Sequence, residues 1–201
     1  MSIKPKQQIQ NTQSGFALLL SIIISSVVLA IGVSLLHVSV SQINLASTAR
    51  ESEIAFQAAN AGVDCLWYWR YENVRELLFV QSAPPPSFSC FTKTPDSSSY
   101  TTESLAANGF IDRYSYTFTW GPGVAGDRCS QVDMYIMHPE GATGIVNKDF
   151  TSVNKGIGNG GIKSCEPGNL CTIIVSRGYN RVCSDINTSI FTIQRELTVE
   201  F

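Results

Sequence analysis

Residues 16–40 read FALLLSIIISSVVLAIGVSLLHVSV, and these 25 residues contain no Asp, Glu, Lys or Arg. As an α-helix the stretch would be about 37 Å long, because each helical residue adds about 1.5 Å. The hydrocarbon core of a bilayer is about 30 Å thick, so such a helix is long enough to cross it once. We therefore expect a membrane-spanning helix over residues 16–40.

The segment before this stretch, MSIKPKQQIQNTQSG, is short, basic and polar, and it ends with Gly15 directly against Phe16. A Sec-type signal has an apolar region of about 7–15 residues followed by its cleavage site, whereas here the candidate cleavage position precedes the apolar stretch. The positive-inside rule leaves Lys4 and Lys6 in the cytoplasm and the rest of the chain outside. We expect residues 1–15 to form a leader peptide and the following head to be extracytoplasmic.

The helical pattern continues beyond the membrane span. Apolar residues recur at spacings of 3, 7, 3, 4 and 3, which place them on one face of a helix: Ala46, Ala49, Phe56, Ala59, Val63 and Leu66. This stripe predicts that the helix continues to about Arg70. We assign residues 41–80 to the amphipathic second half of the helix. The proline-rich segment 82–90 then ends any helix that reaches Val80. Such a helix has two roles, in an apolar environment such as a membrane first and against a head domain second.

Residues 81–201 are predicted to form a β-rich head. Alternation with polar residues marks one strand with a buried face formed by Tyr114, Tyr116, Phe118 and Trp120. Short β-rich stretches follow at 132–137 and 172–175. The intervals between them are rich in turn residues and show no second helix, so the sheet should be antiparallel. The predicted fold is therefore α+β, with a long N-terminal helix packed on one apolar face of an antiparallel sheet.

The strongest strand pattern is at the C-terminus. One face would carry the apolar residues Phe191, Ile193, Leu197, Val199 and Phe201. Arg195 is the one charged residue on that face. It would either form an ion pair with an acidic residue of the helix or reach solvent from an edge position.

Six cysteines follow the apolar stretch: Cys65, Cys90, Cys129, Cys165, Cys171 and Cys183. An even number in an exported domain predicts disulfides, and no pair of C-x-x-C motifs indicates structural zinc. Six cysteines allow 15 pairings, so the pairing stays open. Because Cys65 lies on the predicted helix, a bridge from it would attach the helix to the head. A Cys171–Cys183 bridge would close a loop worth about 3 kcal/mol.

Gly15 and Phe16 carry a resemblance to a known family. A short basic leader, a glycine and a phenylalanine that opens an apolar helix resemble the prepilin peptidase site of type IV pilins and type II secretion pseudopilins. The stretch AFQAANAGVDCLWYW, residues 55–69, is similar to a segment in the helix of minor-pilin-like proteins. The resemblance implies cleavage between Gly15 and Phe16 and N-methylation of Phe16. It also implies an inner-membrane assembly platform and other pilin-like subunits as partners, in a cell-surface filament.

Leu20 departs from the family pattern, which has a glutamate five residues into the mature chain. In the family that carboxylate neutralises the terminal amine of a neighbouring subunit, and an unpaired ion in a dry core costs several kcal/mol. Family members without it are typically minor subunits, so the resemblance implies a subunit at the filament tip or in initiation. The alternative is an uncleaved, single-pass membrane protein whose extracytoplasmic domain binds a ligand.

The sequence contains no motif that indicates an enzyme, cofactor or metal site. The glycine-rich segment 156–161 lacks the Lys-Ser/Thr of a phosphate-binding loop, and His138 has no nucleophile elbow to accompany it. Oxygen ligands for calcium are available but do not form a known loop: Asp127, Asp133, Asp149, Asp185 and Asn187. A formal charge of −2 indicates no nucleic-acid partner. Trp67, Tyr68 and Trp69 would form either an adhesive patch or, in the interpretation we prefer, part of the core.

Overall fold

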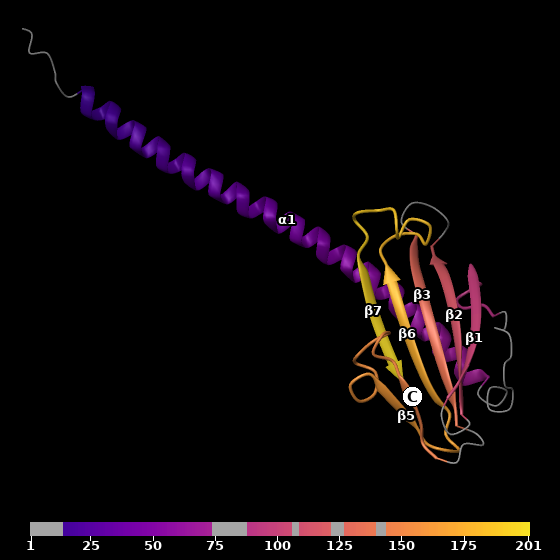
Figure 1. Cartoon of the computed structure of the whole chain (residues 1–201). Coiled ribbons are helices and arrows are strands. Elements are labelled where there is room, and N and C mark those ends of the chain that lie inside the picture. Colours follow the sequence, from indigo (N-terminus) through magenta and orange to yellow (C-terminus); the bar gives the residue numbers. More distant parts are fainter. Residues whose placement is uncertain (1–13, 74–87, 106–108, 122–126, 140–143) are drawn as a thin grey trace, which may run out of the picture. The chain divides into compact units, whose positions relative to one another are not determined.

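The computed structural model describes residues 14–73, 88–105, 109–121, 127–139 and 144–201. The chain divides into two units, Met1–Thr48 and Ala49–Phe201, and each is described by itself. The helix α1 (Ser14–Glu72) contributes residues to both units, and all strands belong to the second (Figure 1). Residues 1–13 of the predicted leader, the predicted helical residues 74–80 and connector residues 82–87 lie outside the described residues.

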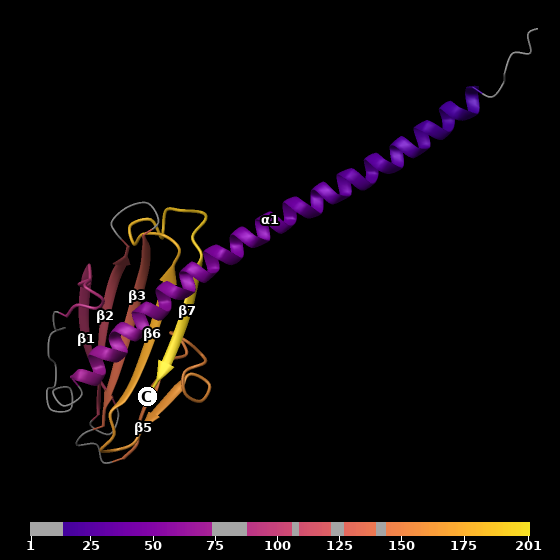
Figure 2. The same ribbon diagram turned by 180° about the vertical axis from the view of Figure 1, so that it is seen from behind.

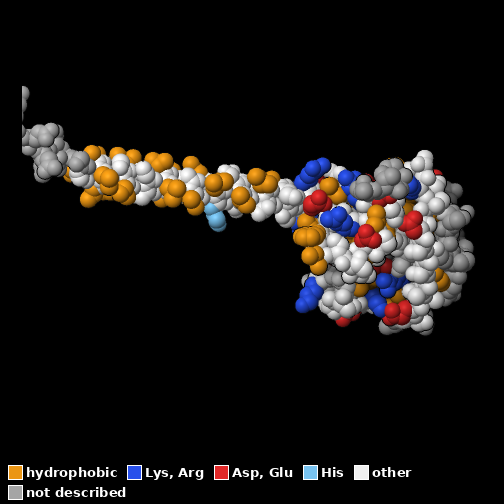
Figure 3. Space-filling model, turned by 90° about the horizontal axis from the view of Figure 1, so that it is seen from above, with side chains coloured by type: hydrophobic (Ala, Val, Ile, Leu, Met, Phe, Trp, Pro, Cys, Tyr) orange, Lys and Arg blue, Asp and Glu red, His pale blue; other side chains and the backbone are white. Residues whose placement is uncertain are grey.

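In the first unit, α1 has no buried side chain among the described residues. The face seen in Figure 3 carries hydrophobic side chains along this part of the helix, and no Asp, Glu, Lys or Arg side chain. Some of its serines return their hydroxyl groups to the helix backbone: Ser21 Oγ donates to the Leu18 carbonyl (2.9 Å) and Ser39 Oγ to the Leu35 carbonyl (2.9 Å). These polar groups are therefore satisfied without water, as an apolar environment requires.

In the second unit, α1 lies across one face of the sheet (Figure 2). Ala59, Val63 and Leu66 are buried as predicted. The predicted start of the stripe is wrong, because Ala46 and Ala49 are exposed and so is Phe56. The residues that face the sheet there are instead smaller: Ala55, Ala58 and Gly62. The helix approaches the sheet too closely at this end to leave space for a phenylalanine ring.

Five strands form the main sheet, and every neighbouring pair is antiparallel, as predicted. Its order is β1-β2-β3-β6-β7, with β1 and β7 at the edges. The bounds are β1 Ser97–Ser104, β2 Phe110–Trp120, β3 Arg128–His138, β6 Cys171–Tyr179 and β7 Gln194–Glu200. A separate antiparallel pair is formed by β4 (Val146–Asp149) and β5 (Ile162–Cys165).

The main sheet is covered on both faces, whereas the sequence predicted one apolar face. On the helix side, a core contains residues of α1 together with Tyr114, Tyr116 and Phe118. On the other side, a second core joins the sheet to β4, β5 and the segment between them, with Tyr135, Met137, Val146, Phe150, Ile157, Ile173 and Val175. This arrangement explains why the central strand β3 is buried almost continuously from Val132 to His138.

The C-terminal strand β7 is shorter and less buried than predicted. It begins at Gln194, so Phe191 lies outside it and is 69 % exposed, while Leu197 and Val199 are half-buried. Of the two alternatives for Arg195, the edge position is confirmed, since β7 is an edge strand and Arg195 is exposed. Its guanidinium does reach the helix, but Nε donates to the Ser52 hydroxyl (2.7 Å) and not to a carboxylate.

Candidate functional site

The predicted cleavage position lies in the first turn of α1. Gly15 is the second helical residue, and no described atom lies within 4 Å of the point that a Cβ would occupy. Phe16 follows with 73 % of its surface exposed. The first four N–H groups of a helix have no intrahelical partner, and glycine is a weak helix former. Unwinding Gly15 and Phe16 into an extended peptide would therefore break few hydrogen bonds.

The apolar stretch that follows has no packing partner among the described residues of its own unit. Leu20 is 47 % exposed, and Leu29 is 71 % exposed. By length and composition, α1 is compatible with a single membrane crossing, and it is the one such helix among the described residues. Leu20 is thus an apolar side chain within an apolar helix surface.

All six cysteines form disulfides, which favours an extracytoplasmic head. The pairs are Cys65–Cys90, Cys129–Cys183 and Cys165–Cys171. The predicted bridge from the helix into the head is therefore confirmed at Cys65. The Cys171–Cys183 loop is wrong, because Cys171 at the start of β6 pairs with Cys165 at the end of β5 and so joins the two sheets.

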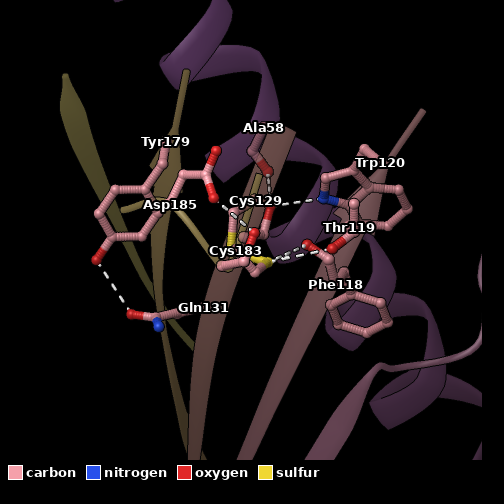
Figure 4. Close-up of a disulfide and its surroundings, with 11 residues drawn as sticks. Ala58, Phe118, Thr119, Trp120, Cys129, Gln131, Tyr179, Cys183 and Asp185 are labelled. Carbon is pink, nitrogen blue, oxygen red and sulfur yellow. Dashed lines mark hydrogen bonds between the residues drawn. A yellow bond between two sulfur atoms is a disulfide. The ribbon is translucent and has the colours of Figure 1, made fainter. Parts of the chain in front are cut away.

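The Cys129–Cys183 bridge attaches the connection between β6 and β7 to the centre of the sheet (Figure 4). Thr119 Oγ1 lies 3.3 Å from Cys183 Sγ and in hydrogen-bonding geometry with it. Beside the bridge, Trp120 Nε1 donates to Ser130 Oγ (2.6 Å), and Ser130 Oγ donates in turn to the Ala58 carbonyl of α1. These contacts therefore hold the β6–β7 connection, the strand β3 and the helix α1 together.

His138 takes part in a buried contact that the sequence did not indicate. Its Nε2 lies 3.3 Å from Asp112 Oδ2, and both side chains are almost fully buried. Tyr100 donates its hydroxyl to the other carboxylate oxygen (2.7 Å), and the Phe110 ring stacks on the imidazole. Among the described residues, no hydrogen bond joins His138 to a serine hydroxyl. Asp112 and His138 are 26 residues apart, and only the register of β2 and β3 brings them together.

Replacing Asp112 by asparagine should lower the free energy of unfolding at neutral pH. It should also make the free energy of unfolding depend less on pH in acid. Burial by itself raises the pKa of the Asp112 carboxyl, but the adjacent His138 imidazole and the hydrogen bond from Tyr100 outweigh it and leave the pKa below its ordinary value. Such a carboxylate stabilises the fold above its unfolded pKa of about 3.9, and this stabilisation is lost as the pH falls through the folded pKa.

Urea unfolding of the full chain between pH 7 and pH 2.5 measures both effects. We expect the asparagine variant to lose about 2 kcal/mol at pH 7 and to show a flatter profile below about pH 4. The exposed Asp96 is the matched control, since Asp96→Asn should leave the profile unchanged. A parallel shift of the whole curve for Asp112→Asn would contradict a lowered folded pKa.

The other motifs have structural roles. Asp133 accepts hydrogen bonds from Arg113 (2.9 Å), Ser115 (2.5 Å) and Arg177 (3.2 Å). Across the described parts of the chain, no three His, Cys, Asp or Glu side chains gather to hold a metal ion. The glycine-rich segment forms turns between β4 and β5, and the Gly158 amide donates to the Glu200 carboxylate (2.8 Å).

The three aromatic residues at 67–69 divide between the two interpretations. Trp69 is buried in the helix-side core and lies 6.1 Å from Tyr114 between ring centroids. Trp67 and Tyr68 are 46 % and 59 % exposed. The preferred interpretation is therefore correct for one residue and wrong for the other two.

No protein-family model matches this chain, and no curated protein or solved structure is significantly similar to it.

Proposed function

We propose that this chain is a minor pilin-like subunit of a type IV pilus or type II secretion pseudopilus. The observation that carries the proposal is the division of α1 into two halves. Residues 16–45 present apolar side chains on all sides with no burial, whereas residues from Ala55 to Trp69 bury one face against a sheet. Apolar surface is stable only away from water, so the first half requires lipid or neighbouring helices. A pilin helix leaves the lipid and packs against neighbouring helices when the subunit enters a filament.

The junction between Gly15 and Phe16 supports processing by a prepilin peptidase. The glycine stands at a helix end that unwinds at low cost, and Phe16 is exposed. Cleavage there would remove residues 1–15 and leave Phe16 as the methylated first residue. The chain would then act by assembly with other pilin-like subunits on an inner-membrane platform, and without enzymatic activity of its own.

Leu20 supports a position at the tip of the filament or in its initiation. A shaft subunit must neutralise the amine of the subunit ahead of it, and a leucine offers no charge for this purpose. A subunit with no neighbour ahead has no such requirement. Sheared filaments in which this chain was the dominant protein would contradict this position.

The mass and first residue of the membrane-extracted protein test the proposal. We expect a methylated Phe16 at the N-terminus of the wild type and a retained leader after Gly15→Leu, because the bulky side chain should block cleavage. Gly32→Leu is the matched control, since Gly32 also lies in α1 with no described atom within 4 Å of its Cβ position. It should be processed normally. A wild-type chain that keeps Met1 would overturn the proposal in favour of an uncleaved membrane-anchored binding domain.

A further inference from the structure

An exposed aromatic surface lies on the side of α1 that faces away from the sheet. Trp67, Tyr68 and Tyr71 are 46 %, 59 % and 64 % exposed. Trp67 and Tyr71 are one helical turn apart, and their rings stack at 5.9 Å between centroids with 18° between their planes. The stacking restricts the orientation of the Trp67 ring. Large aromatic groups gathered on a surface mark binding sites more often than isolated ones do.

A cavity of about 450 Å³ opens between this surface and the turn that follows Cys90. Its walls include Trp67, Tyr68 and Phe91, and the disulfide Cys65–Cys90 connects the two sides. Asp64 and Ser89 complete the described part of the lining. Sites for small molecules typically have volumes of about 300–1,000 Å³ and mostly apolar walls with a few polar groups. The cavity therefore has the size and lining of a small-molecule site.

The turn holds Phe91 in a conformation that costs free energy. Cys90 and Lys93 exchange two backbone hydrogen bonds of 2.8 Å, and the two residues between them have positive φ angles, 49° at Phe91 and 67° at Thr92. A bulky or β-branched residue in this region is a clear outlier, since glycine or asparagine occupies such turns at lower cost. The turn nevertheless presents Phe91 with 72 % of its surface exposed. Strain of this kind concentrates at ligand-binding sites.

The charge of the cavity selects the ligand. Among its described lining residues, Asp64 is the only charged one, and it lies three and four residues before Trp67 and Tyr68 on the same side of the helix. Aromatic faces attract cations through their quadrupole, and a carboxylate adds direct attraction. We propose that this aromatic cavity binds a quaternary ammonium group of the trimethylammonium type.

A primary ammonium group fits the lining less well. It has three N–H donors that need acceptors, whereas the described lining side chains present mainly ring faces apart from the Asp64 carboxylate and the hydroxyl groups of Ser89 and Tyr68. A quaternary ammonium has no N–H group, so contact with apolar ring faces leaves no donor unsatisfied. A neutral apolar group would fill the same space but would gain nothing from Asp64.

Choline and its uncharged isostere 3,3-dimethylbutanol test the proposal, because the two differ in charge and hardly in shape. The full chain is placed in nanodiscs of phosphatidylglycerol, whose headgroup has no ammonium. Binding is followed by NMR through the N-methyl signal, which ring currents should shift upfield. We expect choline to bind about 10-fold more tightly than the isostere. Binding is also measured with free phosphocholine and with added phosphatidylcholine vesicles. The comparison of the two distinguishes a soluble ligand from a lipid headgroup.

Matched variants locate the binding. Trp67→Ala should weaken choline binding about 10-fold and Asp64→Asn about 3-fold, whereas Phe191→Ala and Asp185→Asn, which change an exposed aromatic residue and an exposed carboxylate elsewhere, should leave it unchanged. Equal affinities for choline and the isostere would overturn the proposal, as would an Asp64→Asn variant that binds normally. These results are independent of the processing of Gly15, so either proposal can fail without the other.

Discussion

Replacing Gly178 by alanine is expected to lower the free energy of unfolding of the head by more than about 3 kcal/mol. A Cβ at this position of β6 would stand 2.1 Å from the Ala55 carbonyl oxygen and 2.2 Å from the Ala59 backbone nitrogen of α1. Both atoms belong to helix backbone, which cannot move aside as a flexible side chain can. The helix must therefore be displaced from the sheet, and its core contacts weaken together.

Urea unfolding of the full chain, followed by near-ultraviolet circular dichroism, measures this loss. Gly144→Ala is the matched control, because no described atom lies within 4 Å of its Cβ position and its φ is not positive. It should change stability by less than about 0.5 kcal/mol. A Gly178→Ala variant as stable as this control would show that the helix backbone does not lie this close to β6.

The close approach extends along a seam of small residues. Gly62 of α1 faces β3 and β6, where a Cβ would meet Val132 Cγ2 and Ser176 Oγ, both at 2.6 Å. The hydrogen bond from Ser130 Oγ to the Ala58 carbonyl also requires the helix backbone to lie near the sheet. Small side chains thus set the distance between helix and sheet, and larger ones such as Leu66 and Trp69 fill the core beyond the seam.

This seam explains which part of the helix prediction failed. Hydrophobic periodicity assigns weight to Phe56 and little to Ala55, Ala58 or Gly62, yet the small residues are those that face the sheet. The period itself was correct, since Ala59, Val63 and Leu66 are buried. Periodicity reports which residues are apolar, but not how near a partner surface comes.

The strands were predictable where one face is apolar, as in β2, and less so where both faces are covered. The second core depends on β4, β5 and the turns between them, which are short and have no clear alternation. The Asp112–His138 contact and the three disulfides depend on strand register, which spacing alone does not determine.

The two candidate sites also differ in how far the sequence alone could reveal them. Gly15 and Phe16 are adjacent in sequence, so a local motif was enough to single them out. The aromatic cavity brings Trp67 near Phe91 only because Cys65 pairs with Cys90. The six cysteines could pair in 15 ways, and other pairings would bring other residues together. Exposed Trp67 and Tyr68 were the available signal, and the turn that completes the cavity was not visible in the sequence.

Removing the Cys129–Cys183 bridge is expected to cost about twice as much stability as removing Cys165–Cys171. In the chain-entropy model a bridge between residues 54 apart contributes about 4 kcal/mol, and one between residues 6 apart about 2 kcal/mol. The two pairs are matched in burial, since Cys129 and Cys165 are fully buried and Cys183 and Cys171 are half-buried. Packing losses should therefore be similar, and the difference should report the loop that each bridge closes.

Double alanine variants test this order by urea unfolding of the full chain. Each variant keeps four cysteines, and mass analysis after alkylation checks that the two remaining bridges have formed. The longer bridge also attaches the connection between β6 and β7 to the centre of the sheet, so its removal should release that connection and increase its hydrogen exchange. Equal losses in the two variants, or a larger loss for Cys165–Cys171, would mean that contacts of the folded state dominate the effect of the bridges over the entropy of the unfolded chain.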